Sequence, residues 1–157
     1  MDNICFFAGH SKLYGVDDIY SRLVKEVENL IVNYNVKSFF VGNYGDFDRL
    51  SAAAVGELKK KYSDVRLTLV IPYLTREIEH NKEFYYKNYD GILIADIPET
   101  TPVRIRIIKC NQYMANKASH LICYVKNSWG GAAKTLEYVR NKKDIGIINL
   151  IDNKSAE

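Results

Sequence analysis

The chain has 157 residues, of which 47% are hydrophobic, and its 22 basic and 19 acidic residues give a formal net charge of +3. This length fits one compact domain with a substantial core, and we expect a single domain over residues 1–151 and a flexible tail over residues 152–157. The mild positive charge does not indicate a nucleic-acid partner. The apolar runs fall well short of the roughly 20 residues that cross a bilayer, and the first residues lack the features of a signal peptide. A cytoplasmic protein without a membrane partner is therefore expected.

Cysteine and histidine are too scattered to indicate a metal site. Cys5, Cys110 and Cys123 show no CxxC spacing, which suits buried thiols in a reducing compartment. His10, His80 and His120 do not pair at any metal-ligand spacing, and no carboxylate cluster stands near His10 in the sequence. The sequence thus predicts neither a metal nor a cofactor.

Six nearly continuous apolar stretches predict strands. They lie at residues 3–9, 37–42, 66–71, 90–95, 120–126 and 145–150. Continuous rather than alternating apolar patterns indicate burial on both faces, and hence a mostly parallel sheet covered by helices. We expect strand order 3-2-1-4-5-6, with the ligand crevice between the first and fourth strands.

The segments between these strands have helical periodicity. The first helix has an apolar face from Val16 to Ile31, with Asp17 or Asp18 suited to its N-terminus, and the second begins at Asp48. Gly56 in the second helix predicts a close helix–sheet contact, and residues 74–89 predict an exposed helix that could serve as a lid. The third helix should run from Pro102 to about Lys117 with Thr101 as its N-cap, and the last from near Gly131 to near Asn141. This alternation predicts an α/β fold of three layers, a Rossmann-like domain with helices on both faces of a six-stranded sheet.

Glycines follow three of the predicted strands and suggest a ligand site. Gly9 precedes His10, the second loop is Gly42-Asn43-Tyr44-Gly45, and the third is Trp129-Gly130-Gly131. Loops that follow neighbouring parallel strands converge on one edge of the sheet, where glycine lets backbone N–H groups approach a bound group. A phosphate-bearing ligand is the resulting prediction.

The second and third loops also have a structural interpretation. Gly130 and Gly131 before a helix would expose free N–H groups to an anion, with Lys134 and Thr135 adding a charge and a hydroxyl, but a simple helix-capping turn has the same sequence. The P-loop spacing is absent, so hydrolysis of nucleoside triphosphates is not indicated. The second loop lacks G-x-G-x-x-G and is either a ligand loop or a tight turn, in which Asp48 caps the helix.

Three further side chains are candidates for ligand contacts. His10 could bond a phosphate or a ribose, or could be a satisfied loop histidine. Arg104 and Asn111 fall on one side of the third predicted helix, where they would supply a cation and an amide. The alternative to a ligand contact is that both side chains lie on an exposed face of this helix.

The order of these motifs resembles the SLOG superfamily. The residues that carry the resemblance are the strand ending in Phe7-Ala8-Gly9-His10, the segment from Val41 to Asp48, the strand from Leu67 to Tyr73, the helix from Arg104 to Met114, and the loop from Trp129 to Thr135. Within that superfamily the chain looks like small single-domain bacterial proteins of unassigned activity. The resemblance implies a Rossmann-like fold that binds nucleotides or nucleotide-derived molecules, with Gly9, His10, Gly42, Gly45, Asp48, Gly130, Gly131 and Thr135 at the positions of the ligand loops.

The sequence departs from the phosphoribohydrolases among these relatives. Where they carry a glutamate three residues after the threonine, this chain has Tyr138, and Glu137 precedes it. Lys134 and Trp129 replace a glycine and a proline of the same motif. Glu137 nevertheless remains the candidate catalytic residue if the protein is an enzyme.

Three functions follow from this pattern. The first is binding or sensing of a nucleotide-like phosphate ligand, with Tyr44 or Trp129 stacking a base. The second is hydrolysis of the N-glycosidic bond of a nucleoside monophosphate by Glu137, Asp48 or Asp46. The third is an oligomeric scaffold whose interface is formed by exposed tyrosines, of which the chain has 12 in total.

Overall fold

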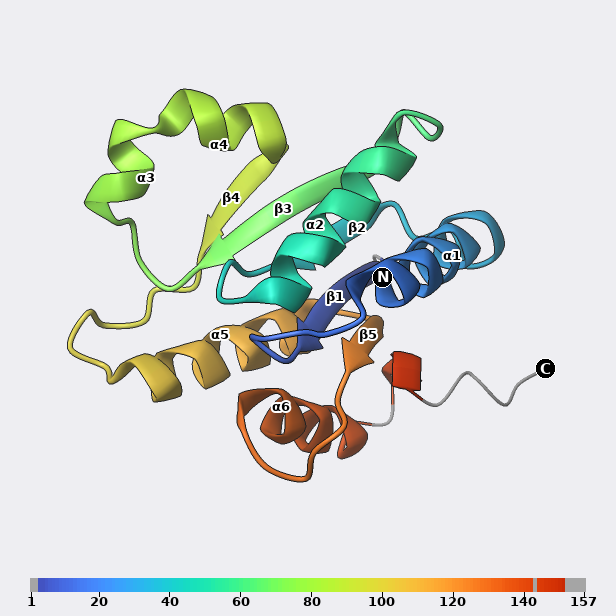
Figure 1. Cartoon of the computed structure of the whole chain (residues 1–157). Coiled ribbons are helices and arrows are strands. Elements are labelled where there is room, and N and C mark those ends of the chain that lie inside the picture. Colours follow the sequence, from blue (N-terminus) through green and yellow to red (C-terminus); the bar gives the residue numbers. More distant parts are fainter. Residues whose placement is uncertain (1–2, 143, 152–157) are drawn as a thin grey trace.

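The computed structural model describes residues 3–142 and 144–151. Its strands and helices alternate along these residues (Figure 1). The strands are β1 (Ile4–Gly9), β2 (Ser38–Val41), β3 (Arg66–Ile71), β4 (Gly91–Ile94), β5 (His120–Tyr124) and β6 (Gly146–Asn149). The helices are α1 (Val16–Tyr34), α2 (Asp46–Lys59), α3 (Arg76–His80), α4 (Lys82–Asn88), α5 (Val103–Lys117) and α6 (Gly131–Arg140). The predicted tail at 152–157 lies outside the described residues.

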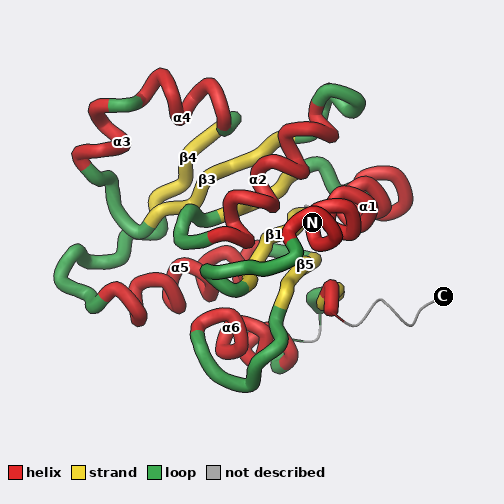
Figure 2. Tube along the Cα trace, in the orientation of Figure 1, coloured by secondary structure: helices red, strands yellow, loops and turns green. Residues whose placement is uncertain are grey.

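The strands form one six-stranded sheet in which every pair is parallel. Helices α1 and α2 pack together on one face, and α5 and α6 pack together on the other, as Figures 1 and 2 show. The predicted α/β class, the parallel sheet and the Rossmann-like three-layer arrangement are therefore confirmed. None of the helices in the described part of the chain is long and apolar enough to span a membrane.

The predicted strand order is wrong. The observed order is β4-β3-β2-β1-β5-β6, so β4 extends the sheet beyond β3 and β1 pairs with β5. The physical reason lies in the two connections around β4. Helices α3 and α4 cover β3 through Ile78 and Tyr85, on the face of the sheet that also carries α2. A right-handed crossover on that face places the next strand, β4, on the far side of β3 from β2. Helix α5 lies on the opposite face and returns the chain to β1. The switch point is therefore between β1 and β5, and not between the first and fourth strands as predicted.

Two smaller expectations also fail. Residues 74–89 lie over β3 and β4 rather than over the pocket described below, which none of them lines. A Cβ atom added at Gly56 would meet nothing within 4 Å, so no close helix–sheet contact requires this glycine.

The apolar core lies on both faces of the sheet. Alternate residues of β1 point to opposite sides, with Phe7 packed toward α1 and α2 and Phe6 toward α5 and α6. All three cysteines are buried, as the sequence predicted.

Helix starts differ from the predicted caps at two positions. Helix α2 begins two residues before Asp48, with Gly45 as the residue that precedes it. Asp48 therefore lies in the first turn. Helix α5 is preceded by Pro102 without a side-chain cap, so Thr101 does not cap it.

Candidate functional site

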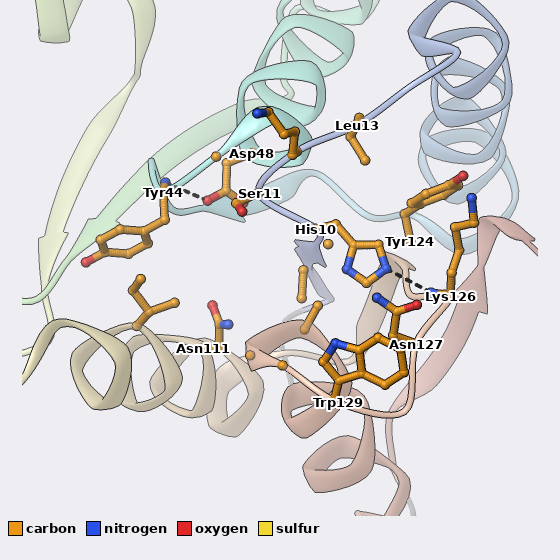
Figure 3. Close-up of a pocket in the computed structure, with 18 of the residues that line it drawn as sticks. His10, Ser11, Leu13, Tyr44, Asp48, Asn111, Tyr124, Lys126, Asn127 and Trp129 are labelled. Atoms are coloured by element: carbon orange, nitrogen blue, oxygen red, sulfur yellow. Dashed lines mark hydrogen bonds between the residues drawn. The ribbon is translucent and has the colours of Figure 1, made fainter.

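A pocket of about 480 Å³ opens at the carboxyl ends of β1 and β5, which is the switch point of the sheet. Ligands of open α/β folds bind at this location, and the volume is within the range of small-molecule sites. Its walls come from the three glycine-containing loops and from α5. The lining residues are Ala8, Gly9, His10, Ser11, Lys12, Leu13, Tyr14, Tyr44, Gly45, Asp48, Arg104, Ile107, Asn111, Tyr124, Lys126, Asn127, Trp129, Gly130, Gly131 and Ala132 (Figure 3).

The first two loops form one wall by binding each other. The backbone N–H of Asp46 donates to the carbonyl oxygen of Ser11 at 2.8 Å, and the Asp46 carboxylate accepts from the N–H of Leu13 at 3.0 Å. This hydrogen bond and the neighbouring Arg49 guanidinium hold the pKa of Asp46 below its ordinary value. Asp46 is therefore engaged in holding the loops together.

Close packing explains the glycines of these two loops. A Cβ at Gly45 would lie 2.7 Å from Ser11 Cβ and 3.0 Å from the Ser11 carbonyl oxygen, and one at Gly9 would lie 2.6 Å from Cδ2 of Phe47. The protein's own atoms fill the space that the glycine pattern suggested for a ligand. Gly9 and Gly45 line the pocket, but contacts between the loops are what require them to be glycine.

The third loop is different, because its glycines face open space. Gly130 has a left-handed backbone with φ of 94°, and a Cβ at either Gly130 or Gly131 would meet nothing within 4 Å. The first helical hydrogen bond of α6 runs from the N–H of Lys134 to the carbonyl oxygen of Gly130, and no side chain caps the helix. The N–H groups of the first turn are thus available to an anion at the positive end of the helix dipole.

Asn111 projects from α5 into the pocket and is held by α6. Its amide nitrogen donates to Oγ1 of Thr135 at 2.9 Å, and that hydroxyl donates to the carbonyl oxygen of Gly131 at 3.0 Å. Thr135 is 1% exposed, so it lies behind Asn111 rather than on the pocket surface.

His10 lies near the centre of the pocket in Figure 3. Its Nε2 accepts from the backbone N–H of Lys126 at 2.9 Å. Burial, and secondarily the charge of Lys126, lower the pKa of His10. The neutral ring therefore carries its proton on Nδ1, which is a donor.

Asp48 is the carboxylate that lines the pocket. It accepts from the backbone N–H of Tyr44 at 2.9 Å (Figure 3). Burial raises its pKa to about 6, although this hydrogen bond acts in the opposite direction. Asp48 consequently titrates close to neutral pH.

Cations and aromatic rings gather around the opening. Lys12, Arg104 and Lys126 line the pocket, so their charges outweigh the single carboxylate of Asp48. Tyr14 and Trp129 also line it and are 78% and 70% exposed. The opening thus attracts anions and offers flat apolar surfaces.

Most of the residues predicted from sequence meet in this pocket, but five do not line it. Gly42 and Asn43 lie in the second loop without reaching it, Thr135 lies behind Asn111, and Lys134 and Glu137 are exposed on α6 outside the lining. The ten that do line it are Gly9, His10, Tyr44, Gly45, Asp48, Arg104, Asn111, Trp129, Gly130 and Gly131.

Sequence reasoning misses much of the first and third loops. Ser11, Lys12 and Tyr14 follow β1, and Lys126 and Asn127 follow β5. Their position directly after a predicted strand could have indicated that they line the pocket. The prediction used the glycines of the loops instead, and these do not identify the neighbouring side chains. Ile107 is also missed, although it stands three residues after Arg104 and four before Asn111 and so shares their side of α5.

Among the described residues, no group of three or more histidine, cysteine, aspartate or glutamate side chains is arranged to hold a metal ion.

Comparisons with known proteins define the fold. The structure of DNA processing protein A (DprA) from Streptococcus pneumoniae superposes with a TM-score of 0.68 and 14% sequence identity over 96% of this chain. The likeness covers 52% of that protein, so this chain spans about half its length. The Rossmann-like fold implied by the SLOG resemblance is therefore present.

Sequence comparisons add little. A DNA gyrase protein of Buchnera aphidicola subsp. Baizongia pistaciae (strain Bp) is 28% identical over 92 residues, which are 59% of this chain and 10% of that protein. No protein-family model matches the chain.

Proposed function

We propose that the protein binds or senses a nucleotide or a nucleotide-derived phosphate ligand at the carboxyl edge of its sheet. The observation that supports this most is the meeting, in one pocket, of the uncapped start of α6 with the side chains of Lys12, Arg104 and Lys126. Free N–H groups and cations favour a phosphate. Trp129 and Tyr14 provide surfaces on which a base can stack.

The experiment uses the fluorescence of Trp129, which is the single tryptophan of the chain and lines the pocket. The protein is titrated with inorganic phosphate, ribose 5-phosphate and AMP, and the affinities are checked by calorimetry. Comparison of the three affinities gives the contributions of the phosphate, the sugar and the base. Arg104→Gln should weaken AMP binding by about two- to tenfold, because it removes a partly solvated phosphate contact.

Arg140→Gln is the matched control, since Arg140 is exposed on α6 and does not line the pocket. Its affinity for AMP should equal that of the wild type. Equal losses in both variants would indicate only a general effect of net charge, and absence of binding of all three probes would refute the proposal.

A second candidate is hydrolysis of a nucleoside monophosphate at its N-glycosidic bond, which the raised pKa of Asp48 favours. In this reaction water adds to the anomeric carbon and the base leaves with a proton, so free base and ribose 5-phosphate are released. Asp48 takes the place of Glu137 in this proposal, because Glu137 does not line the pocket.

Incubation of high enzyme concentrations with a panel of nucleoside monophosphates tests it by the appearance of free base. Release that is abolished in Asp48→Asn supports the enzyme. Binding of a nucleotide without release of free base supports the binding or sensing function. A stable oligomer in light scattering, without binding of any nucleotide, favours the scaffold whose interface is formed by exposed tyrosines.

A further inference from the structure

The hydrogen bonds around Thr135 fix which end of the Asn111 amide faces the pocket. Thr135 Oγ1 lies 3.0 Å from the carbonyl oxygen of Gly131, which can only accept, so the hydroxyl proton points there. The Asn111 atom 2.9 Å from the same hydroxyl must therefore be the donor, Nδ2. The carbonyl oxygen Oδ1 is left on the other side of the amide.

Asn111 Oδ1 is an acceptor that faces the pocket and is open to a ligand donor. The side chain is among the few buried polar groups of the described residues, with 9% exposure, and it lines the pocket. In Figure 3 it points from α5 into the pocket. The side-chain hydrogen bond of Asn111 to Thr135 is made by its nitrogen, so among the described residues its oxygen is left to the pocket. An amide oxygen held in a largely buried position gains from a bonded donor and loses when it is unpaired.

The surroundings restrict the chemistry of that donor. Asn111 is tied through Thr135 to the first turn of α6, where the proposed phosphate binds. The oxygens of a phosphate dianion cannot donate to Oδ1, whereas a neighbouring hydroxyl can. Asp48 offers a second acceptor from the α2 side of the pocket, facing α5 in Figure 3.

We infer that Asn111 Oδ1 accepts a hydrogen bond from a sugar hydroxyl of the phosphate ligand, and that Thr135 is a positioning residue that holds the amide in this orientation. The inference rests on the proposed function. It assigns the pocket a preference for ribose over deoxyribose phosphates. Thr135 acts through Asn111 and does not touch the ligand, because its hydroxyl is buried and bonded on both sides.

The test compares the affinities for AMP, 2′-deoxyAMP and 3′-deoxyAMP. Loss of the relevant hydroxyl should weaken binding by roughly 2- to 12-fold, because one hydrogen bond to an acceptor that water can also reach is lost. Thr135→Val has nearly the same shape and lacks the hydroxyl, so the amide can rotate and the ratio of ribo to deoxy affinities should fall toward one. Thr135→Ser keeps the hydroxyl and should restore the ratio.

Asn111→Ala provides a second variant if Thr135→Val does not fold. It removes the acceptor itself, and the three ligands should then bind with similar affinity. Inorganic phosphate, which has no sugar, is titrated against the same variants. Arg140→Gln lies outside the pocket lining and should keep both the phosphate affinity and the ratio of ribo to deoxy affinities of the wild type.

The outcomes separate the two proposals. Equal binding of all three nucleotides to the wild type refutes the inference while the phosphate site stands. A preference that persists in Thr135→Val or in Asn111→Ala refutes the role of the corresponding residue. If neither phosphate nor AMP binds, the proposed function itself fails and the inference fails with it.

Discussion

Replacing Gly45 with alanine should destabilise the protein by forcing apart the two loops that form one wall of the pocket. The new Cβ would lie 2.7 Å from Ser11 Cβ and 3.0 Å from the Ser11 carbonyl oxygen. Neither neighbour can move freely, because the N–H of Asp46 binds that carbonyl and the Asp46 carboxylate binds the N–H of Leu13. The backbone at Gly45 is extended, with φ of 179°, so alanine adopts it without strain and the steric contact alone decides the result.

Overpacking of this kind costs about 1–3 kcal/mol. For a chain of this size, each 1 kcal/mol lowers Tm by roughly 2–4 °C, which gives a fall of about 2–12 °C. Urea unfolding followed by circular dichroism measures the free energy, and a thermal scan measures Tm. The unfolding slope should not change, since the fold is retained.

Gly131→Ala is the matched control. It also lines the pocket and stands at the start of a helix, but its new Cβ meets nothing within 4 Å. Its unfolding free energy should stay within about 0.5 kcal/mol of the wild type or rise slightly. If the two alanine variants are equally stable, the close approach of Ser11 to Gly45 is refuted.

Two further stability changes follow from the structure. Gly56→Ala should raise the free energy of unfolding by about 0.5–1 kcal/mol, because alanine favours the interior of α2 and its methyl group meets no neighbour; a lower urea midpoint would contradict this. Burial raises the pKa of Asp48 from 3.8 to about 6 in the folded state. Between these pH values the folded state binds more protons than the unfolded state, so the contribution of Asp48 to stability is lost as the pH rises through this window. Asp48→Asn should therefore gain stability relative to the wild type from pH 4 to pH 7, by up to about 3 kcal/mol, and a pH-independent difference in urea unfolding would refute the raised pKa.

The elements of the sheet are predictable because they depend on local pattern. Continuous apolar runs indicate each strand, and Gly130-Gly131 indicates the start of α6. The edge of the sheet at which the pocket opens also follows, since loops after parallel strands meet at one edge. The order of the strands does not follow, because it depends on which face of the sheet each connecting helix covers, and the sequences of α3 and α4 do not specify a face.

The roles of individual residues depend even more on distant contacts. Asp46 and Glu137 are both candidate catalytic carboxylates in the sequence. In the structure Asp46 binds the N–H of Leu13, and Glu137 lies outside the pocket lining. The sequence predicts Asp48 as the cap of α2, but it binds the N–H of Tyr44 within the pocket wall. None of these partners is encoded in the spacing of the motif.

By itself the sequence determined the class of fold, the edge of the sheet where the loops meet and the Gly130-Gly131 start of α6, because periodicity and glycine placement act over a few residues. Only the tertiary structure decided that Gly9 and Gly45 are required by Phe47 and Ser11, and that Thr135 stands behind Asn111. These are contacts between segments far apart in the chain. Packing brings them within a few ångströms and so decides which polar atoms are already bonded and which remain for a ligand.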